Sequence, residues 1–222
     1  MSLYSLISLN SLISLKTEKM KKVLSILLLL LLGTSLNTNA QSADKAADQV
    51  AALSRAVKAL GGYEVRFTVA VGEHKMSGRY MVGDDRYALS LGNVEAYGGR
   101  ECRYEVDTSR KEVVIDRVDN TSHNLLSNPL SAFDFIGDEY RAELLSEHAG
   151  KVVVRLTPHQ NPEQSGVIEV AIDSKTDLPK SIVYRPSGES IRVDIDHIGT
   201  TSARPQKYDH AKFKDFEVID FR

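Results

Sequence analysis

The sequence contains almost no cysteine and no tryptophan. Its only cysteine is Cys102, so no disulfide can form within one chain. A folded domain must therefore be stabilised by its apolar core rather than by cross-links. A single thiol in a strand-like run is more typical of a small buried hydrophobe than of a catalytic nucleophile, so we expect no catalytic role for Cys102.

An excess of positive charge is also absent. The whole chain has a formal net charge of -2 at pH 7. Residues 41–222 are more acidic still, because residues 1–40 contain four lysines and a single acidic residue, Glu18. No basic stripe stands out, which argues against nucleic acid as a partner and against tight adsorption to anionic lipid surfaces.

The common motifs of catalytic and metal-binding sites are missing. The sequence has no GxSxG nucleophile turn, no HExxH zinc helix, no CxxC pair and no phosphate-binding glycine loop. The six histidines are scattered, and no two have the close spacing of metal ligands. We therefore predict a protein that is not an enzyme, with no catalytic residue, no metal and no cofactor.

The N-terminal region has the pattern of a secretory signal. Residues 20–40 read MKKVLSILLLLLLGTSLNTNA, in which two lysines precede an apolar stretch from Val23 to Leu32 that only Ser25 interrupts. This stretch is too short to span a bilayer comfortably, and small and polar residues follow it. We expect a signal peptide over residues 1–40, with Met20 as the true start and cleavage before Gln41. Residues 41–222 should then form one soluble domain in the periplasm.

Apolar residues predict one helix followed by many strands. Val50, Leu53, Val57 and Leu60 recur at helical spacing within residues 44–60, and two glycines follow. From Tyr63 the period changes to two, as expected for strands with one covered face. The strand-like runs lie within 63–71, 76–82, 87–91, 102–106, 113–115, 152–156, 168–172, 182–184 and 191–195, with another in the tail.

The alternation stops at Asn120, where a helical insert is expected. Asn128-Pro129 is a suitable helix start, and residues 138–146 present Leu144 and Leu145 as a second helical patch. The predicted fold class is therefore α+β, with a strongly curved antiparallel sheet of about ten strands and helices covering its concave face.

The sequence GVIEVAIDSKTDLPKSIVYR at 166–185 predicts a hairpin and resembles the matching hairpin of the LolA family of periplasmic lipoprotein carriers. The order of elements is also similar, through YEVRFTVAV, SGRYMV, DRYALSL, VEAYGGRECRYEVD, EVVID, NPLSAF and KVVVRLTP. The resemblance implies a half-open, incomplete barrel with helices as a lid. Its cavity would hold the acyl chains of a lipoprotein, or another lipid, during transfer toward the outer membrane. It also implies a monomer that meets an inner-membrane donor complex and an outer-membrane acceptor.

A curved sheet of this size has more concave apolar surface than a few short helices can cover, which leaves room for an acyl chain. Eleven residues are candidates for lipid binding: Phe67, Val69, Met76, Tyr80, Tyr87, Leu89 and Tyr104 in the sheet, and Leu130, Phe133, Phe135 and Ile136 in the lid. The alternative is a non-enzymatic interaction or sensor domain of the cell envelope. In that case the same residues pack as an ordinary core, and the domain recognises a protein or peptide.

Overall fold

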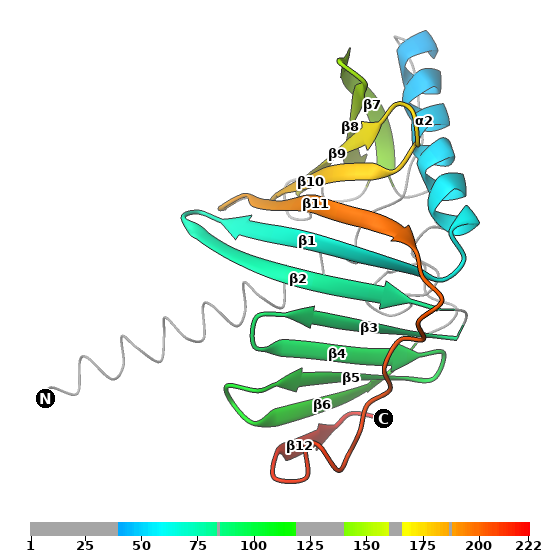
Figure 1. Cartoon of the computed structure of the whole chain (residues 1–222). Helices are drawn as coiled ribbons and strands as arrows, with labels where there is room; N and C mark the ends of the chain where they lie inside the picture. Colours follow the sequence, from blue (N-terminus) through cyan, green and yellow to red (C-terminus); the bar gives the residue numbers. More distant parts are fainter. Residues whose placement is uncertain (1–39, 84, 119–139, 160–165, 187) are drawn as a thin grey trace, which may run out of the picture.

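A computed structural model describes residues 40–83, 85–118, 140–159, 166–186 and 188–222, which form one helix and one sheet of twelve strands (Figure 1). The elements are α2 (Ala40–Ala59), β1 (Tyr63–Val71), β2 (His74–Val82), β3 (Arg86–Leu91), β4 (Val94–Gly99), β5 (Cys102–Asp107), β6 (Glu112–Arg117), β7 (Tyr140–His148), β8 (Lys151–Pro158), β9 (Val167–Asp173), β10 (Pro179–Arg185), β11 (Ile191–Thr200) and β12 (Glu217–Asp220).

The sheet is strongly curved and does not close into a barrel. Its strand order is β12-β6-β5-β4-β3-β2-β1-β11-β10-β9-β8-β7, so β12 and β7 are its two edges. Neighbouring strands are antiparallel, except that β12 runs parallel to β6. The prediction of a curved, open sheet agrees with this arrangement, although the described residues form twelve strands rather than about ten.

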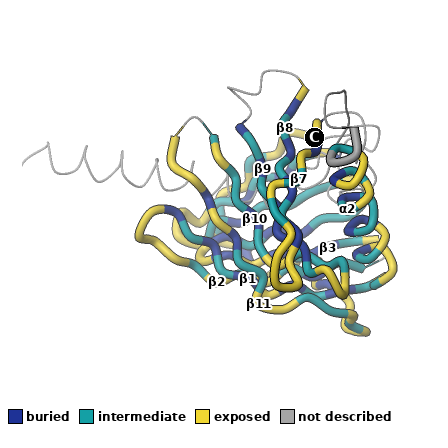
Figure 2. Tube along the Cα trace, turned by 90° about the horizontal axis from the view of Figure 1, so that it is seen from above, coloured by how far each residue is buried: buried dark blue, intermediate teal, exposed yellow. Residues whose placement is uncertain are grey.

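Helix α2 packs against one end of the sheet. Its residues Ala46, Val50, Leu53 and Val57 are buried, at the spacing of one helical face. That face lies mainly against β7 and β8, and Figure 2 shows its buried side toward the sheet and its exposed side away from it. The expected cover of the concave face by several helices is not confirmed, since the described residues contain this helix alone and it lies at one end.

The second helical patch predicted over residues 138–146 is wrong for the described part, which is strand β7. Tyr140 and Ala142 are buried and alternate with exposed residues. The register with β8 shifts between Leu144 and Ser146, which is a β-bulge. Because the bulge inserts Leu145 beside Leu144, two adjacent leucines occur in a strand and imitate a helical pattern.

The first core lies on the face of the sheet that packs against α2, which we call the inner face. It contains buried residues from β1, β3, β4, β7 to β11 and α2, with partly buried side chains of β2 packed against it. On β1 the alternation places Phe67 and Val69, both fully buried, on this face. The opposite, outer face of β1 carries Glu64, Arg66 and Thr68, which are exposed or half-buried.

The second core lies on the outer face, over β4 to β6. It consists of Tyr97, Val106, Val113, Ile115 and Phe213, with Ala88, Tyr104, Tyr208 and Phe216 packed against it. The residues from the tail come from the segment 205–216, which crosses this part of the sheet (Figure 1). The sheet therefore buries its inner face at one end and its outer face at the other.

Candidate functional site

Six of the predicted lipid-binding residues lie together on the inner face. Phe67 and Val69 are on β1, Met76 and Tyr80 on β2, and Tyr87 and Leu89 on β3. Val69 pairs with Met76, and Tyr80 pairs with Leu89, so their side chains point to one side of the sheet. The exposed fractions of Phe67 and Val69 are 0%, and those of Tyr87 and Leu89 are 2% and 4%, while Met76 and Tyr80 are half-buried.

Tyr104 does not belong to this group, and its assignment to the same surface is corrected. It pairs with Tyr97, and its ring stacks on that of Tyr208 with 4.3 Å between centroids and 5° between planes. These contacts place Tyr104 on the outer face, in the second core. Alternation divides a strand into two faces, but it does not say which face of one strand continues which face of another. The predicted lid residues, Leu130, Phe133, Phe135 and Ile136, lie outside the described residues.

Two glycines shape the inner face by letting aromatic rings cross the neighbouring strand. Gly78 pairs with Phe67, and a Cβ atom at Gly78 would lie 2.3 Å from Phe67 Cζ. Gly98 pairs with Tyr87 in the same way, and its Cβ would lie 2.3 Å from Tyr87 Cε1. Since no real Cβ could occupy either position, both rings lie directly against the backbone of the next strand.

A row of tyrosines runs across β1, β2 and β3. The ring centroids of Tyr63 and Tyr80 are 6.5 Å apart, and those of Tyr80 and Tyr87 are 5.9 Å apart. Burial raises the pKa of all three hydroxyls above the ordinary value for tyrosine, so each is a neutral donor at physiological pH. Our sequence prediction omitted Tyr63, although the alternation of β1 places it on the same face as Phe67.

The inner face changes from apolar to charged between β4 and β5. Arg103 and Glu105 on β5 pair with Gly98 and Ala96, so they continue the inner face. Asp116 on β6 pairs with Arg103, and Arg103 Nη2 donates to Asp116 Oδ2 at 2.9 Å. The face that presents Phe67 and Leu89 at one end therefore presents an ion pair at the other. A surface of this kind suits an amphiphilic ligand better than a plain hydrocarbon.

Two cavities among the described residues open elsewhere. One of about 540 Å³ is lined mainly by outer-face side chains of β1, β2 and β11, among them Arg66, Arg79 and His197. The other, of about 470 Å³, lies between β3 to β5 and residues 206–208 and includes Arg86 and Cys102. Both contain charged side chains, which makes them poor sites for an acyl chain.

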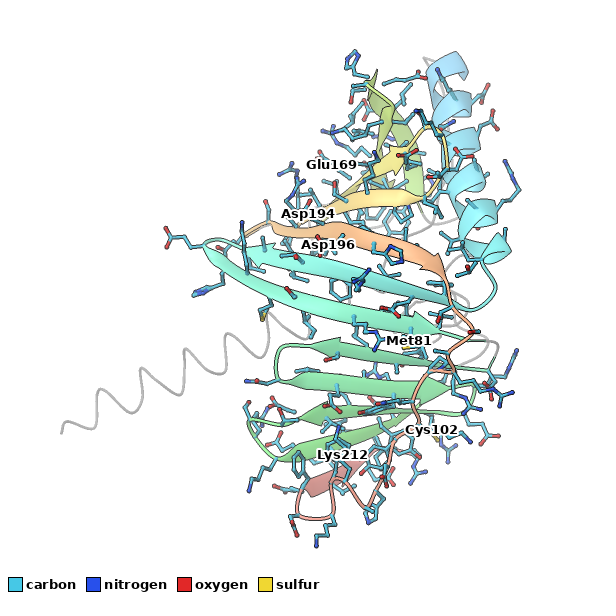
Figure 3. The ribbon with its side chains drawn as sticks, in the orientation of Figure 1. Met81, Cys102, Glu169, Asp194, Asp196 and Lys212 are labelled. Carbon is cyan, nitrogen blue, oxygen red and sulfur yellow. The ribbon has the colours of Figure 1, made fainter. Side chains whose placement is uncertain are left out.

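The outer face of β8 to β11 is a charged surface. Glu169, Asp194 and Asp196 mark it in Figure 3. Glu169 accepts hydrogen bonds from Arg155 at 3.2 Å and Arg185 at 3.0 Å. The hydrogen bond from Arg185 is the main cause that holds the pKa of Glu169 below its usual value. Burial opposes this effect, and the hydrogen bond from Arg155 adds to it. This surface is therefore ionised and ion-paired at neutral pH.

The part of the chain that the structure describes lacks the features of a metal site and of a membrane-spanning helix. No three His, Cys, Asp or Glu side chains there are grouped so as to hold a metal ion. Of the helical residues in the same part, none form a stretch with the length and apolarity needed to cross a bilayer.

Comparison with known proteins shows similarity of fold. No protein-family model matches the sequence, and neither does any curated protein. A solved structure of an uncharacterized conserved protein from Thermus thermophilus is similar at a TM-score of 0.50 and 8% identity, over 79% of this chain and 99% of that one. The similar structures also include a LolA superfamily protein from Nitrosomonas europaea. That match has a TM-score of 0.35 and 10% identity, over 72% of this chain and 94% of the other.

A third similar structure is MucB in the MucA/MucB complex of Pseudomonas aeruginosa. The TM-score is 0.45 and the identity 14%, over 76% of this chain, which spans 60% of the MucB chain. At these identities the comparisons describe the fold and do not assign a ligand.

Proposed function

We propose that the protein is a non-enzymatic carrier of the periplasm that binds acyl chains of lipoproteins or other lipids on its inner face. It would pass them toward the outer membrane. The observation that supports this most is the extent of the apolar inner face, which continues across β1 to β4. Helix α2 packs mainly against β7 and β8, near one edge of the sheet.

The energy available on such a face is sufficient for reversible extraction of a lipid. Each buried methylene contributes roughly 0.8 kcal/mol. A sixteen-carbon chain could thus contribute on the order of 12 kcal/mol before the losses on association are subtracted. Even partial cover of the chain by residues such as Phe67, Tyr80 and Leu89 would leave useful affinity.

A second candidate function is an envelope interaction domain that recognises a protein or peptide. The low exposure of Phe67, Val69, Tyr87 and Leu89 favours it, because side chains that are already buried resemble an ordinary packed core. In that case the inner face stabilises the domain, and recognition takes place on another surface. The two candidates differ in whether the inner face takes up an acyl chain.

Native mass spectrometry of the purified protein distinguishes the two. A carrier is expected to retain acyl lipid through purification, or to take up an added triacylated peptide. A mass without lipid and without uptake of the peptide would contradict the carrier and favour the interaction domain.

A pair of variants on β2 locates the binding surface. Met76→Lys places a charge on the inner face, and we expect it to weaken acyl binding about tenfold or more, since an apolar site binds poorly beside a buried charge. Ser77→Lys is the matched control, because Ser77 is exposed on the other side of the same strand. Equal binding by both variants would remove the inner face from the site.

A further inference from the structure

The hydroxyl of Tyr87 lies at the border between the apolar and charged parts of the inner face. Its ring lies over Gly98, and Tyr87 Oη is only 2.6 Å from where a Cβ of Gly98 would be. Gly98 pairs with Tyr87 on one side and with Arg103 on the other. The ring therefore reaches across β4 toward β5, away from the other apolar residues of β1 and β2.

This hydroxyl is buried and has no hydrogen-bond partner within the described structure. Tyr87 is 2% exposed, and its Oη is among the few buried side-chain oxygens there that make no hydrogen bond. An unsatisfied buried hydroxyl costs free energy, because it loses its contacts with water and gains none in return. Phenylalanine would fill the same space without that cost, so the retained oxygen calls for a function.

Charged side chains surround the hydroxyl, and two of them are already paired with each other. Arg103 and Asp116 form an ion pair, and Glu105 lies on the same face of β5. The pKa of Tyr87 is raised by burial first; Arg103 opposes this effect, and Glu105 and Asp116 add to it. The hydroxyl thus lies close enough to these groups to interact with them electrostatically. A ligand that reaches it along the apolar face would meet a neutral donor first and charges beyond it.

We propose that Tyr87 Oη donates a hydrogen bond to the carbonyl oxygen of the ester or amide that joins an acyl chain to its headgroup. The chain would lie on β1 to β4, and the headgroup would lie over the charged inner face of β5 and β6. This inference rests on the proposed carrier function and specifies its cargo, which is an acylated molecule rather than a hydrocarbon chain alone. Tyr87 then selects for the linkage, while the apolar face supplies most of the affinity.

The test compares probes with and without the carbonyl, bound to the wild type and to Tyr87→Phe. 1-Palmitoylglycerol is compared with its ether counterpart 1-hexadecylglycerol. A peptide with an O-palmitoylserine is compared with one carrying an O-hexadecylserine, because both linkages are uncharged. We expect the wild type to bind a carbonyl probe about 3- to 10-fold more tightly than its partner, the range of one net hydrogen bond. The pair with the larger preference distinguishes a lipid ester from an acylated peptide as the source of the carbonyl.

In Tyr87→Phe the preference for the carbonyl should disappear, while binding of the ether probes stays unchanged. The melting temperature of the unliganded variant should not fall, since the substitution removes only an unsatisfied hydroxyl. Tyr104→Phe is the matched control, because Tyr104 lies on the outer face, and it should keep the preference. The same preference in wild type and Tyr87→Phe would overturn the inference. Failure of the wild type to bind any of the probes would instead contradict the carrier function.

Discussion

The two cores of this protein differ in composition, in cover and in the face of the sheet that they occupy. The first core lies on the inner face and is mostly aliphatic, with an α-helix packed against it. The second core lies on the outer face of β4 to β6, and tyrosine and phenylalanine make up much of it. One continuous sheet can therefore bury opposite faces at its two ends, provided that one strand is covered on both sides.

Strand β4 is that strand. Val94 and Ala96 are buried toward the first core, and Tyr97 is buried toward the second. Beyond it, β5 and β6 bury only outer-face residues, namely Val106, Val113 and Ile115. The change of face explains why the inner face of β5 and β6 can be charged at no cost to the apolar core.

The segments that cover the two cores, helix α2 and residues 205–216, also differ in the contacts that fix them to the sheet. The segment 205–216 contributes its rings to the second core through stacking, with Tyr208 between Tyr104 and Phe213 at 4.3 and 5.7 Å. It is also tied to β4 by an ion pair between Lys212 Nζ and Glu95 Oε2 at 2.7 Å. Lys212 is labelled in Figure 3. We expect the second core to open more easily than the first, because fewer buried contacts hold its cover.

The largest expected effect comes from removing the central ring of the second core. Phe213→Ala should lower the free energy of unfolding of the second core by about 3–5 kcal/mol, since Phe213 is 2% exposed. Amide hydrogen exchange should accelerate in β5 and β6 much more than in β8 and β9. Phe221→Ala is the control, because Phe221 is 68% exposed and its loss should change little. Equal acceleration in all strands would show that the two cores unfold as one.

An intermediate effect is expected on the inner side of β4. Gly98→Ala forces a methyl group into the Tyr87 ring and should cost about 1–3 kcal/mol in urea unfolding, because the ring is buried and cannot move aside. Gly188→Ala is the control, since a methyl group there would meet no atom within 4 Å. If both variants were equally stable, close packing on the inner side of β4 would be disproved.

The smallest effect should come from the ion pair that ties the tail to β4. Burial alone would raise the pKa of Glu95, but hydrogen bonds from Lys212 and Tyr97 outweigh it and hold that pKa below its usual value. The stabilisation is therefore present above the pKa of an unfolded glutamate and is lost as the pH falls through the lower folded value.

Lys212→Ala should accordingly destabilise the protein at pH 7 by about 0.2–1 kcal/mol, as partly exposed ion pairs do. The difference from the wild type should vanish in acid, when Glu95 is protonated. Thermal unfolding of both proteins across pH 2.5–7 measures this, with Lys214→Ala as the control, because Lys214 is an exposed lysine of the same segment. A difference that persists undiminished in acid would show that Lys212 acts through its contact with the Phe213 ring, whose centroid is 4.6 Å away.

Much of the fold was predictable because most strands have one face that is exposed to solvent. The alternation of β1 and the helical spacing of Val50, Leu53 and Val57 are strong local patterns, and both predictions are confirmed. Strand β4 was missing from the predicted strands, because a strand buried on both faces and ending in two glycines does not alternate clearly. Leu145 misled the prediction of β7, since a bulge breaks the period of two.

The candidate site was predictable only in part, for a different reason. Phe67 and Leu89 share a face because they lie on one side of neighbouring strands, which period and strand order together can indicate. Tyr104 has the same local pattern, yet it contacts Tyr208, far away in the sequence. Which face a strand buries depends on a tertiary contact, and local periodicity contains no information about it.

The parallel pairing of β12 with β6 has a consequence for the order of folding. Strands β4 to β6 end at Arg117, whereas the rings that cover them lie between Tyr208 and Phe216. Pairing over such a long stretch of chain is slow, because loop-closure entropy must be overcome before the contacts form. During synthesis, the aromatic surface of β4 to β6 stays exposed to water until residues 208–216 have been made. Aggregation through this surface competes with the closing of the tail over it.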